Sequence, residues 1–292
     1  MNKYRQLGNT NIEVCTIGLG AMPLSLDGRP DEAQALDVIE AFVAGGGNFI
    51  DSANVYCIDD SDVGHNEKLI ARALSKLEDA KNIIVATKGG LRRPSGGWTV
   101  DGSPEWLRQS CEKSLQDLNT DSIFLYQLHA PDPDVPLTDS VGELARLKAE
   151  GKIHHIGLSN VTVEQIQLAL SITDIISVQN RCNLFEQTSF ENGVVKFCEE
   201  HNISFIAHSP VGGHFQHAQR AEDRLLKKLA EKHAVSTYQI MLAWLLNKSP
   251  SILAIPGASK ISSITDSLRA INVELSKEDM QLLEKQQGSG CA

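Results

Sequence analysis

Four residues suited to proton transfer follow short apolar runs in the first half of the chain. They are Asp51, Tyr56, Lys88 and His129. Free tyrosine has a pKa near ~10, and a neighbouring ammonium stabilises the phenolate and lowers that pKa. We therefore expect Tyr56 to donate a proton to a substrate oxygen, with Lys88 tuning its acidity. Asp51 would hold Lys88 and keep it charged, and His129 would donate to the same oxygen.

Each of these residues also has a purely structural explanation. Asp51 can cap the turn that follows it, and Tyr56 can be an ordinary loop aromatic. Lys88 can form a structural ion pair, and His129 can be a hydrogen-bonded core residue. A different chemistry is also open, because a lysine at a strand end can form a Schiff base. We favour the proton-transfer interpretation, because all four residues would lie at one end of the same barrel of parallel strands.

Eight short apolar runs alternate with longer amphipathic stretches and would position these residues. The pattern is typical of parallel strands joined by crossover helices, and successive units are spaced by the roughly 30 residues that one unit needs. Eight units predict an α/β fold, a (β/α)8 TIM barrel with its active site at the carboxyl ends of the strands. The predicted strands cover residues 14–20, 48–53, 83–89, 122–129, 154–160, 175–180, 204–210 and 253–259.

Three helices between these strands have recognisable start signals. They are expected over residues 30–47 after Pro30, 103–118 with Ser103 as cap, and 138–152 with Thr138 as cap. The rival fold is an open doubly wound sheet, which predicts G-x-G-x-x-G after the first strand. The stretch "GLGAM" stops after G-x-G. No interval or linker suggests a second domain, so residues 1–292 are expected to form one domain.

Composition excludes several classes of function. The chain has 41% hydrophobic and 22% charged residues, with no apolar stretch near 18 residues and no apolar core at its amino terminus. The net charge of -10 argues against nucleic acid or an acidic membrane as partner. The six cysteines are scattered without a C-x-x-C pair, which indicates reduced thiols and a cytoplasmic location.

A carbonyl reduction would need a bound nicotinamide, because no side chain supplies a hydride. The later strands offer groups that can hold one. Ser159, Asn160 and Gln179 carry the hydroxyl and amide groups that suit a carboxamide. The stretch "HSPVGG" at 208–213 lets backbone approach a pyrophosphate, and "IPGASK" at 255–260 places a serine and a lysine after the last strand, where barrels often bind phosphate.

The sequence resembles the aldo-keto reductases over nearly its whole length. The matching pieces are "GLGAM", "NFIDSANVY", "GHNEKLIARAL", "VATKGG", "LYQLHAPDP", "GKIHHIGLSN", "VQNRCN", "HSP" and "IPGAS", in this order and spacing. The resemblance implies a (β/α)8 barrel, NADPH as hydride donor, and reduction of a small aldehyde or ketone to an alcohol. It also implies that Tyr56 is the proton donor, that Lys88 and Asp51 tune it, and that His129 contacts the substrate oxygen.

The resemblance further implies a set of cofactor-binding residues. Ser159, Asn160 and Gln179 match carboxamide-binding positions, and Gly20 and Met22 lie on the nicotinamide side. The remaining matches are phosphate contacts and their motif: Ser209, Gly257, Ser259 and Lys260. Trp98 lines the substrate pocket by the same resemblance, although it can equally be a packing aromatic.

Two positions depart from the family pattern. His208 stands where many members stack an aromatic ring on the nicotinamide, and Asp266 and Ser267 stand where the family has Glu-Asn facing the adenine. We count His208 and Asp266 among the cofactor-binding candidates and expect NADP preference to rest mainly on Lys260.

Two other interpretations remain in view. His208, His214 and His217 lie within ten residues, but no carboxylate or cysteine at ligand spacing accompanies them, so no metal is expected. A nicotinamide-binding regulatory module on the same barrel, with little turnover, is the alternative to an enzyme.

Overall fold

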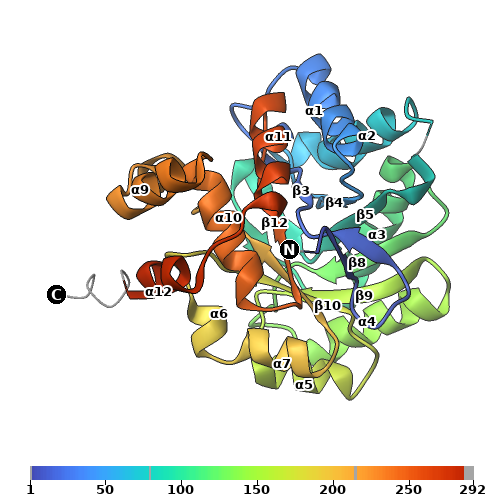
Figure 1. Ribbon diagram of the computed structural model, residues 1–292. Coiled ribbons are helices and arrows are strands. Elements are labelled where there is room, and N and C mark those ends of the chain that lie inside the picture. The colour runs from blue at the N-terminus through green and yellow to red at the C-terminus, as the bar shows by residue number, and fades with distance from the viewer. Residues whose placement is uncertain (1, 79, 214–215, 286–292) are drawn as a thin grey trace.

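The structure is a computed structural model that describes residues 2–78, 80–213 and 216–285. His214 and the terminal "GSGCA", including Cys291, lie outside the described residues. Helices surround a central set of parallel strands, as Figure 1 shows. Among the described helices, none combines the length and the apolar character that crossing a membrane requires.

Eight parallel strands form a nearly closed barrel in which neighbours in the chain are neighbours in the sheet. Parallel bridges from Ile17 to Ala254 and from Gly20 to Gly257 bring the first strand beside the last. This confirms the predicted (β/α)8 TIM barrel. The strands are β3 (Leu19–Gly20), β4 (Phe49–Asp51), β5 (Ile84–Gly89), β8 (Ile123–Leu128), β9 (Ile153–Ser159), β10 (Ser177–Arg181), β11 (Ser204–His208) and β12 (Ile252–Ile255).

The barrel closes at Gly20 through a very short approach of two backbones. A Cβ atom at this position would lie 2.7 Å from the carbonyl oxygen of Ile255, so only glycine fits without displacing β12. Gly20 N also donates to Pro256 O at 3.0 Å. The G-x-G of the first strand therefore serves barrel closure.

Helices cover the outer face of the barrel between successive strands (Figure 1). The first α-helix after each of six barrel strands is α1 (Glu32–Ala44), α2 (His65–Leu74), α3 (Pro104–Leu118), α4 (Leu137–Ala149), α5 (Val163–Leu170) or α11 (Ile261–Arg269), in chain order. After β10 come α6 (Thr188–Glu191) and α7 (Val194–Glu200); after β11 come α8 (His217–Ala221), α9 (Arg224–His233) and α10 (Thr237–Lys248). The chain continues after α11 into α12 (Lys277–Lys285).

Two short hairpins accompany the barrel. The first pairs β1 (Tyr4–Gln6) with β2 (Glu13–Cys15), and the second pairs β6 (Leu91–Arg92) with β7 (Thr99–Val100), both antiparallel. The expectation of one strand over residues 14–20 is thus wrong at its start. Thr16 N donates to Lys3 O at 3.0 Å, so residues 13–15 pair with the amino-terminal strand before the chain enters the barrel.

The barrel interior changes from apolar to polar along the strands. Its lower part is an apolar cluster that includes Leu7, Phe49, Leu125, Ile206 and Leu253. Side chains on one face of a strand recur every second residue, so the positions above Leu125 on β8 are Gln127 and then His129. The polar groups therefore gather at the carboxyl ends of the strands, above an apolar floor.

The helix starts follow their predicted signals in two of three cases. After Pro30, Asp31 caps α1 by accepting from Gln34 N, and Ser103 caps α3 by accepting from Trp106 N at 3.3 Å. Thr138 does not cap α4, because the helix already begins at Leu137 after Pro136. Proline has a fixed φ and suits the boundary of a helix, which explains the earlier start.

Replacing Ser103 with alanine is expected to lower the free energy of unfolding by about 1 kcal/mol, because the first turn of α3 loses its side-chain cap. Urea unfolding of the purified protein measures the change. Thr138→Ala is the matched control and should change the free energy by no more than about 0.5 kcal/mol. Equal losses in both variants would contradict the assignment of the caps.

Candidate active site

Lys88 lies at the centre of the polar cluster inside the barrel. Its Nζ donates to Asp51 Oδ2 at 2.6 Å, to the carbonyl oxygen of Ser52 at 2.8 Å and to the Tyr56 hydroxyl at 3.0 Å. The Lys88 side chain is completely buried. These three contacts use all three N–H donors of the ammonium, so its position is fixed between the carboxylate and the phenol.

Asp51 is held from both sides, so its carboxylate is a buried charge with a full set of partners. While Oδ2 accepts from Lys88, Oδ1 accepts from Gln127 Nε2 at 3.2 Å and from Gln179 Nε2 at 2.8 Å. The two glutamines also contact each other at 3.2 Å. Gln179, a predicted carboxamide contact, therefore also braces the Asp51 carboxylate.

The contacts of Lys88 keep it protonated, and burial keeps Tyr56 neutral. Burial alone would lower the pKa of Lys88, but Asp51 and Tyr56 outweigh it and raise the pKa above the usual value. Burial raises the pKa of Tyr56, and Lys88 offsets only part of that effect. The expected downward influence of Lys88 on Tyr56 is thus present, but burial is stronger. The phenol remains an intact proton donor at neutral pH.

His129 lies beside Tyr56 at the mouth of the barrel. The two ring centroids are 5.8 Å apart and nearly perpendicular, at 81°. Burial, with smaller contributions from Lys88 and His208, lowers the pKa of His129 well below its usual value, so the imidazole is neutral at pH 7. Its Nδ1 has no hydrogen-bond partner among the described residues. A neutral ring has one N–H, which can be donated to a substrate oxygen.

Tyr56 and His129 open onto a cavity of about 550 Å³, a volume in the usual range for ligand sites. Most of the predicted site residues line this cavity. They are Gly20, Met22, Asp51, Trp98, Ser159, Asn160, Gln179, His208, Ser209, Gly257, Ser259 and Asp266. Lys88 lies behind Tyr56 and is completely buried. Lys260 is not among the lining residues; it is exposed and is the N-cap residue of α11.

The ends of β9 and β11 meet along one wall of the cavity. Asn160 and Ser209 both have left-handed backbones, with φ of 58° and 53°. Asparagine adopts this conformation readily, so Ser209 is the less usual of the two. Asn160 Nδ2 donates to the His129 carbonyl at 2.9 Å and to Ser159 Oγ at 3.1 Å. This arrangement links the cavity wall to the loop that carries His129.

His208 presents a neutral ring to the cavity. Burial, helped by Lys88 and Arg181, lowers its pKa to about 3. Its Nδ1 lies 3.2 Å from Ser209 Oγ, and its Nε2 lies 3.5 Å from Asn160 Oδ1. The ring is therefore uncharged at neutral pH, which is compatible with the stacking role of an aromatic ring at this position.

Asp266 also lines the cavity and is hydrogen-bonded to the start of α10. Its two carboxylate oxygens accept from Ser236 Oγ and from Gln239 Nε2, each at 2.6 Å. The carboxylate is therefore engaged by the protein itself at the end where an adenine was expected. The departure from the Glu-Asn pattern has a local structural partner in Ser236, which also caps α10.

Comparison with known proteins identifies the family. The family model "Aldo/keto reductase family" matches residues 16–287. The chain belongs to the aldo-keto reductase family. Among relatives, it is similar to an uncharacterized oxidoreductase of Schizosaccharomyces pombe, with 35% identity over 92% of this chain and 86% of that protein. A probable aldo-keto reductase 1 of Glycine max is 32% identical, over 94% and 86%.

Solved structures agree with this family. An aldo/keto reductase from Klebsiella pneumoniae, in complex with NADP and acetate, is 26% identical, with a TM-score of 0.80 over 100% of this chain and 98% of that chain. Members of the family are oxidoreductases, so these comparisons support carbonyl oxidoreduction in general for this aldo-keto reductase.

Three residues that hold the site together were missed in the sequence. Gln127 braces Asp51, and its place two residues before His129 on one strand face is the signal that would have found it. Arg93 contacts the loop that follows Tyr56. Asn66 is completely buried and donates through Nδ2 to Ala21 O and Ser25 Oγ, while its Oδ1 accepts from Ser52 Oγ. Nothing in the sequence distinguishes Asn66 from an ordinary helix residue.

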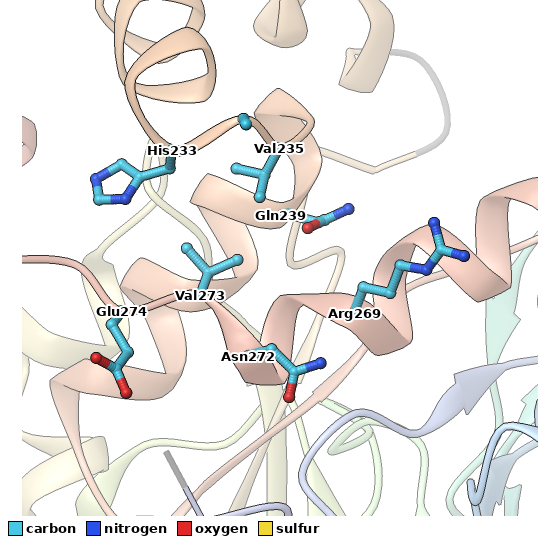
Figure 2. Close-up of a pocket in the computed structure, with 8 residues that line it drawn as sticks. His233, Val235, Gln239, Arg269, Asn272, Val273 and Glu274 are labelled. Carbon is cyan, nitrogen blue, oxygen red and sulfur yellow. The ribbon is translucent and has the colours of Figure 1, made fainter.

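A second hollow on this aldo-keto reductase lies away from Tyr56 and Lys88. Figure 2 shows it between the junction of α9 with α10 and the segment that follows α11, with Val235 and Val273 at its centre. Four of the residues that line this hollow are exposed to solvent: Ala234, Arg269, Asn272 and Glu274. Gln239 contributes to this lining and also donates to Asp266 of the active-site cavity. Tyr56, Asp51 and His129 line the other cavity and not this hollow.

Proposed function

We propose that this aldo-keto reductase reduces an aldehyde or ketone to an alcohol with NADPH as hydride donor and Tyr56 as proton donor. The observation that carries the proposal is the buried chain from Asp51 through Lys88 to the Tyr56 hydroxyl, which opens onto a cavity of ligand size. When bound, the nicotinamide supplies a hydride to the carbonyl carbon. The Tyr56 hydroxyl supplies the proton that completes the alcohol, and Lys88 stabilises the phenolate that remains.

In this mechanism the substrate oxygen binds between the Tyr56 hydroxyl and the His129 ring. The Tyr56 O–H proton goes to that oxygen, and the resulting phenolate is stabilised by Lys88 Nζ, 3.0 Å away. The negative charge of Asp51 balances the ammonium before the reaction. The neutral His129 donates its N–H to the same oxygen and orients it.

The residues present along the cavity fit a dinucleotide. Asn160 and Ser159 offer amide and hydroxyl groups near His129, the flat His208 ring is neutral, and Ser209 and Ser259 offer hydroxyls. Helix α11 begins at Ile261 without a side-chain cap, so the N–H groups of its first turn are available to an anion. We infer that Gly20, Met22, Gln179, Gly257 and Asp266 complete this site.

Lys260 is proposed to select NADPH through its 2′-phosphate. It is exposed beside the uncapped start of α11, next to Ser259, and so can reach a phosphate at the rim of the cavity. Lys260→Ala is expected to weaken NADPH binding by about tenfold and to leave NADH binding unchanged, because a charge-assisted hydrogen bond is lost. Fluorescence titration measures both dissociation constants.

The matched control is Lys277→Ala, which removes an exposed lysine from α12 without approaching the cavity. This variant should bind both cofactors as the wild type does. If Lys260→Ala weakened NADH as strongly as NADPH, the lysine would serve general attraction and the selective role would be wrong.

The proposed function itself is tested by two measurements on the purified protein. NADPH should bind more tightly than NADH, and loss of nicotinamide absorbance should reveal turnover of at least one aldehyde in a panel. Tight binding with turnover below about one per minute on every carbonyl, together with a co-purifying partner protein, would favour the regulatory module, since enzymes commonly turn over near ~10 per second.

We also propose a small carbonyl molecule as substrate, a single domain over residues 1–292 and a cytoplasmic location. The five described cysteines are buried and unpaired, which supports a reducing compartment. The net charge of -10 supports a role without nucleic acid or membrane partners.

A further inference from the structure

Arg93 is a buried arginine that contacts the loop carrying the proton donor. It follows β6 and is only 7% exposed. Its Nη2 donates to the carbonyl oxygens of Cys57 at 3.1 Å and Ile58 at 2.8 Å, and its Nη1 donates to Gly97 O at 3.5 Å. Cys57 and Ile58 are the two residues directly after Tyr56. The guanidinium therefore fixes the backbone that positions the Tyr56 side chain.

The same guanidinium also holds Trp98 against the cavity. Arg93 Cζ lies 4.0 Å from the centroid of the Trp98 ring, within range of a cation–π contact. Trp98 is 46% exposed and lines the cavity together with Tyr56 and Leu91. Because Arg93 covers one part of the indole, the remaining surface is held toward the cavity, where a flat ring can stack on it.

The surroundings of Arg93 are unusual for a charged side chain. No carboxylate lies within 4.0 Å of it among the described residues, and its Nε has no hydrogen-bond acceptor there. Burial of a charge without an ion pair is costly. The guanidinium contacts three carbonyl oxygens and an indole face, and it also interacts electrostatically with the Cys57 thiol and, at longer range, with the Asp59 carboxylate. This arrangement uses the flat, forked shape of a guanidinium.

The neighbouring Arg92 shows the ordinary alternative within the same hairpin. It is exposed, pairs with Asp101 at 2.6 Å and stacks on Trp106 at 3.7 Å. Both arginines thus contact a tryptophan, but only Arg93 is bonded to the loop that follows Tyr56. Arg92 is therefore a close control for charge, size and loss of an arginine–tryptophan contact.

We propose that Arg93 is a positioning residue that fixes the Tyr56 loop and the Trp98 ring together, and so makes the enzyme selective for flat, aromatic carbonyl substrates. This inference rests on the proposed function. The two contacts of Arg93, with the Tyr56 loop and with Trp98, predict two effects that can be measured separately. Loss of the carbonyl contacts should lower kcat for every substrate, whereas loss of the Trp98 support should raise KM for aromatic substrates alone.

The test compares 4-nitrobenzaldehyde with butanal in NADPH-dependent reduction. Arg93→Met should lower kcat between about tenfold and about 100-fold with both aldehydes, because the proton donor is misplaced. It should raise KM by about fivefold for the aromatic aldehyde alone. Arg93→Lys retains a cation under Trp98 but lacks the fork, so it should recover KM more than kcat. The NADPH dissociation constant should match the wild type in each variant, which also reports folding.

A combined variant separates the two effects. Trp98→Leu should raise KM for 4-nitrobenzaldehyde, and adding Arg93→Met should lower kcat without raising that KM again. If Arg93→Met behaved like Arg92→Met in both parameters, or changed only the melting temperature, this inference would be overturned and the proposed function would stand. A wild-type protein that binds NADPH but reduces no aldehyde would overturn the proposed function itself.

Discussion

Tyr56→Phe is expected to lower kcat for aldehyde reduction by about 10²- to 10⁴-fold, the usual contribution of a positioned general acid. The change removes one hydroxyl from a buried ring, and among the described residues that hydroxyl has its only hydrogen bond with Lys88. NADPH binding should be unchanged, because the ring itself remains in the cavity wall. Single-turnover absorbance measurements with saturating NADPH give the chemical rate, and a fluorescence titration gives the dissociation constant. Full activity in this variant would show that another group donates the proton.

The pH profile provides an independent check on Tyr56. Its pKa is raised by burial above the usual value of ~10, so the acid form is complete at neutral pH and is lost only above that value. The pKa of His129 is lowered well below 6.5, so its ring is already neutral at pH 7. We expect kcat/KM for reduction to be flat from about pH 7 to about pH 9 and to fall above about pH 10. A fall through pH 6.5 instead would identify a histidine as the acid.

The barrel was predictable because each strand is a short apolar run with a helix-length interval after it. Buried parallel strands need no alternation, so runs such as 83–89 are visible without a partner. The exception at residues 14–20 arises because its first half pairs with the amino-terminal strand, and antiparallel partners so near the chain start have no distinctive pattern.

The four polar residues of the candidate site were predictable from the sequence, but the residues that hold them in place were not. Asp51, Tyr56, Lys88 and His129 are polar residues at apolar strand ends, which is a rare and visible combination. By contrast, Asn66 acts from a helix, where a buried amide and an exposed one look alike in sequence. The same is true of consecutive arginines at positions 92 and 93, because only the course of the hairpin decides which of them turns inward.

Asp51 and Lys88 form a buried ion pair whose two charges can be removed singly or together. Asp51→Asn leaves the Lys88 ammonium without its counter-charge, and Lys88→Met leaves the carboxylate with only its glutamine donors. Each single change is expected to lower the free energy of unfolding by about 3–5 kcal/mol. The double variant removes both charges, so it should be more stable than either single variant. Urea unfolding at pH 7 measures all four proteins.

Activity should not follow stability in this cycle. The double variant is expected to be stable but to remain at least about 100-fold below wild-type kcat, because the Tyr56 phenolate has lost the ammonium that stabilises it. Recovery of activity together with stability would show that the pair serves only to hold the barrel interior together.

A pH measurement tests the charge of Lys88 directly. Its folded-state pKa is raised above the unfolded value of ~10.5, so its stabilising contribution is complete below that pH and is lost as pH rises through the folded pKa. The wild type should therefore lose stability above about pH 10.5, and the double variant should lack this component. Parallel pH dependence in the two proteins would contradict a charged, paired Lys88. One ammonium contacts both Asp51 and Tyr56. The cycle therefore separates the free-energy cost of burying the two charges from the role of those charges in proton transfer.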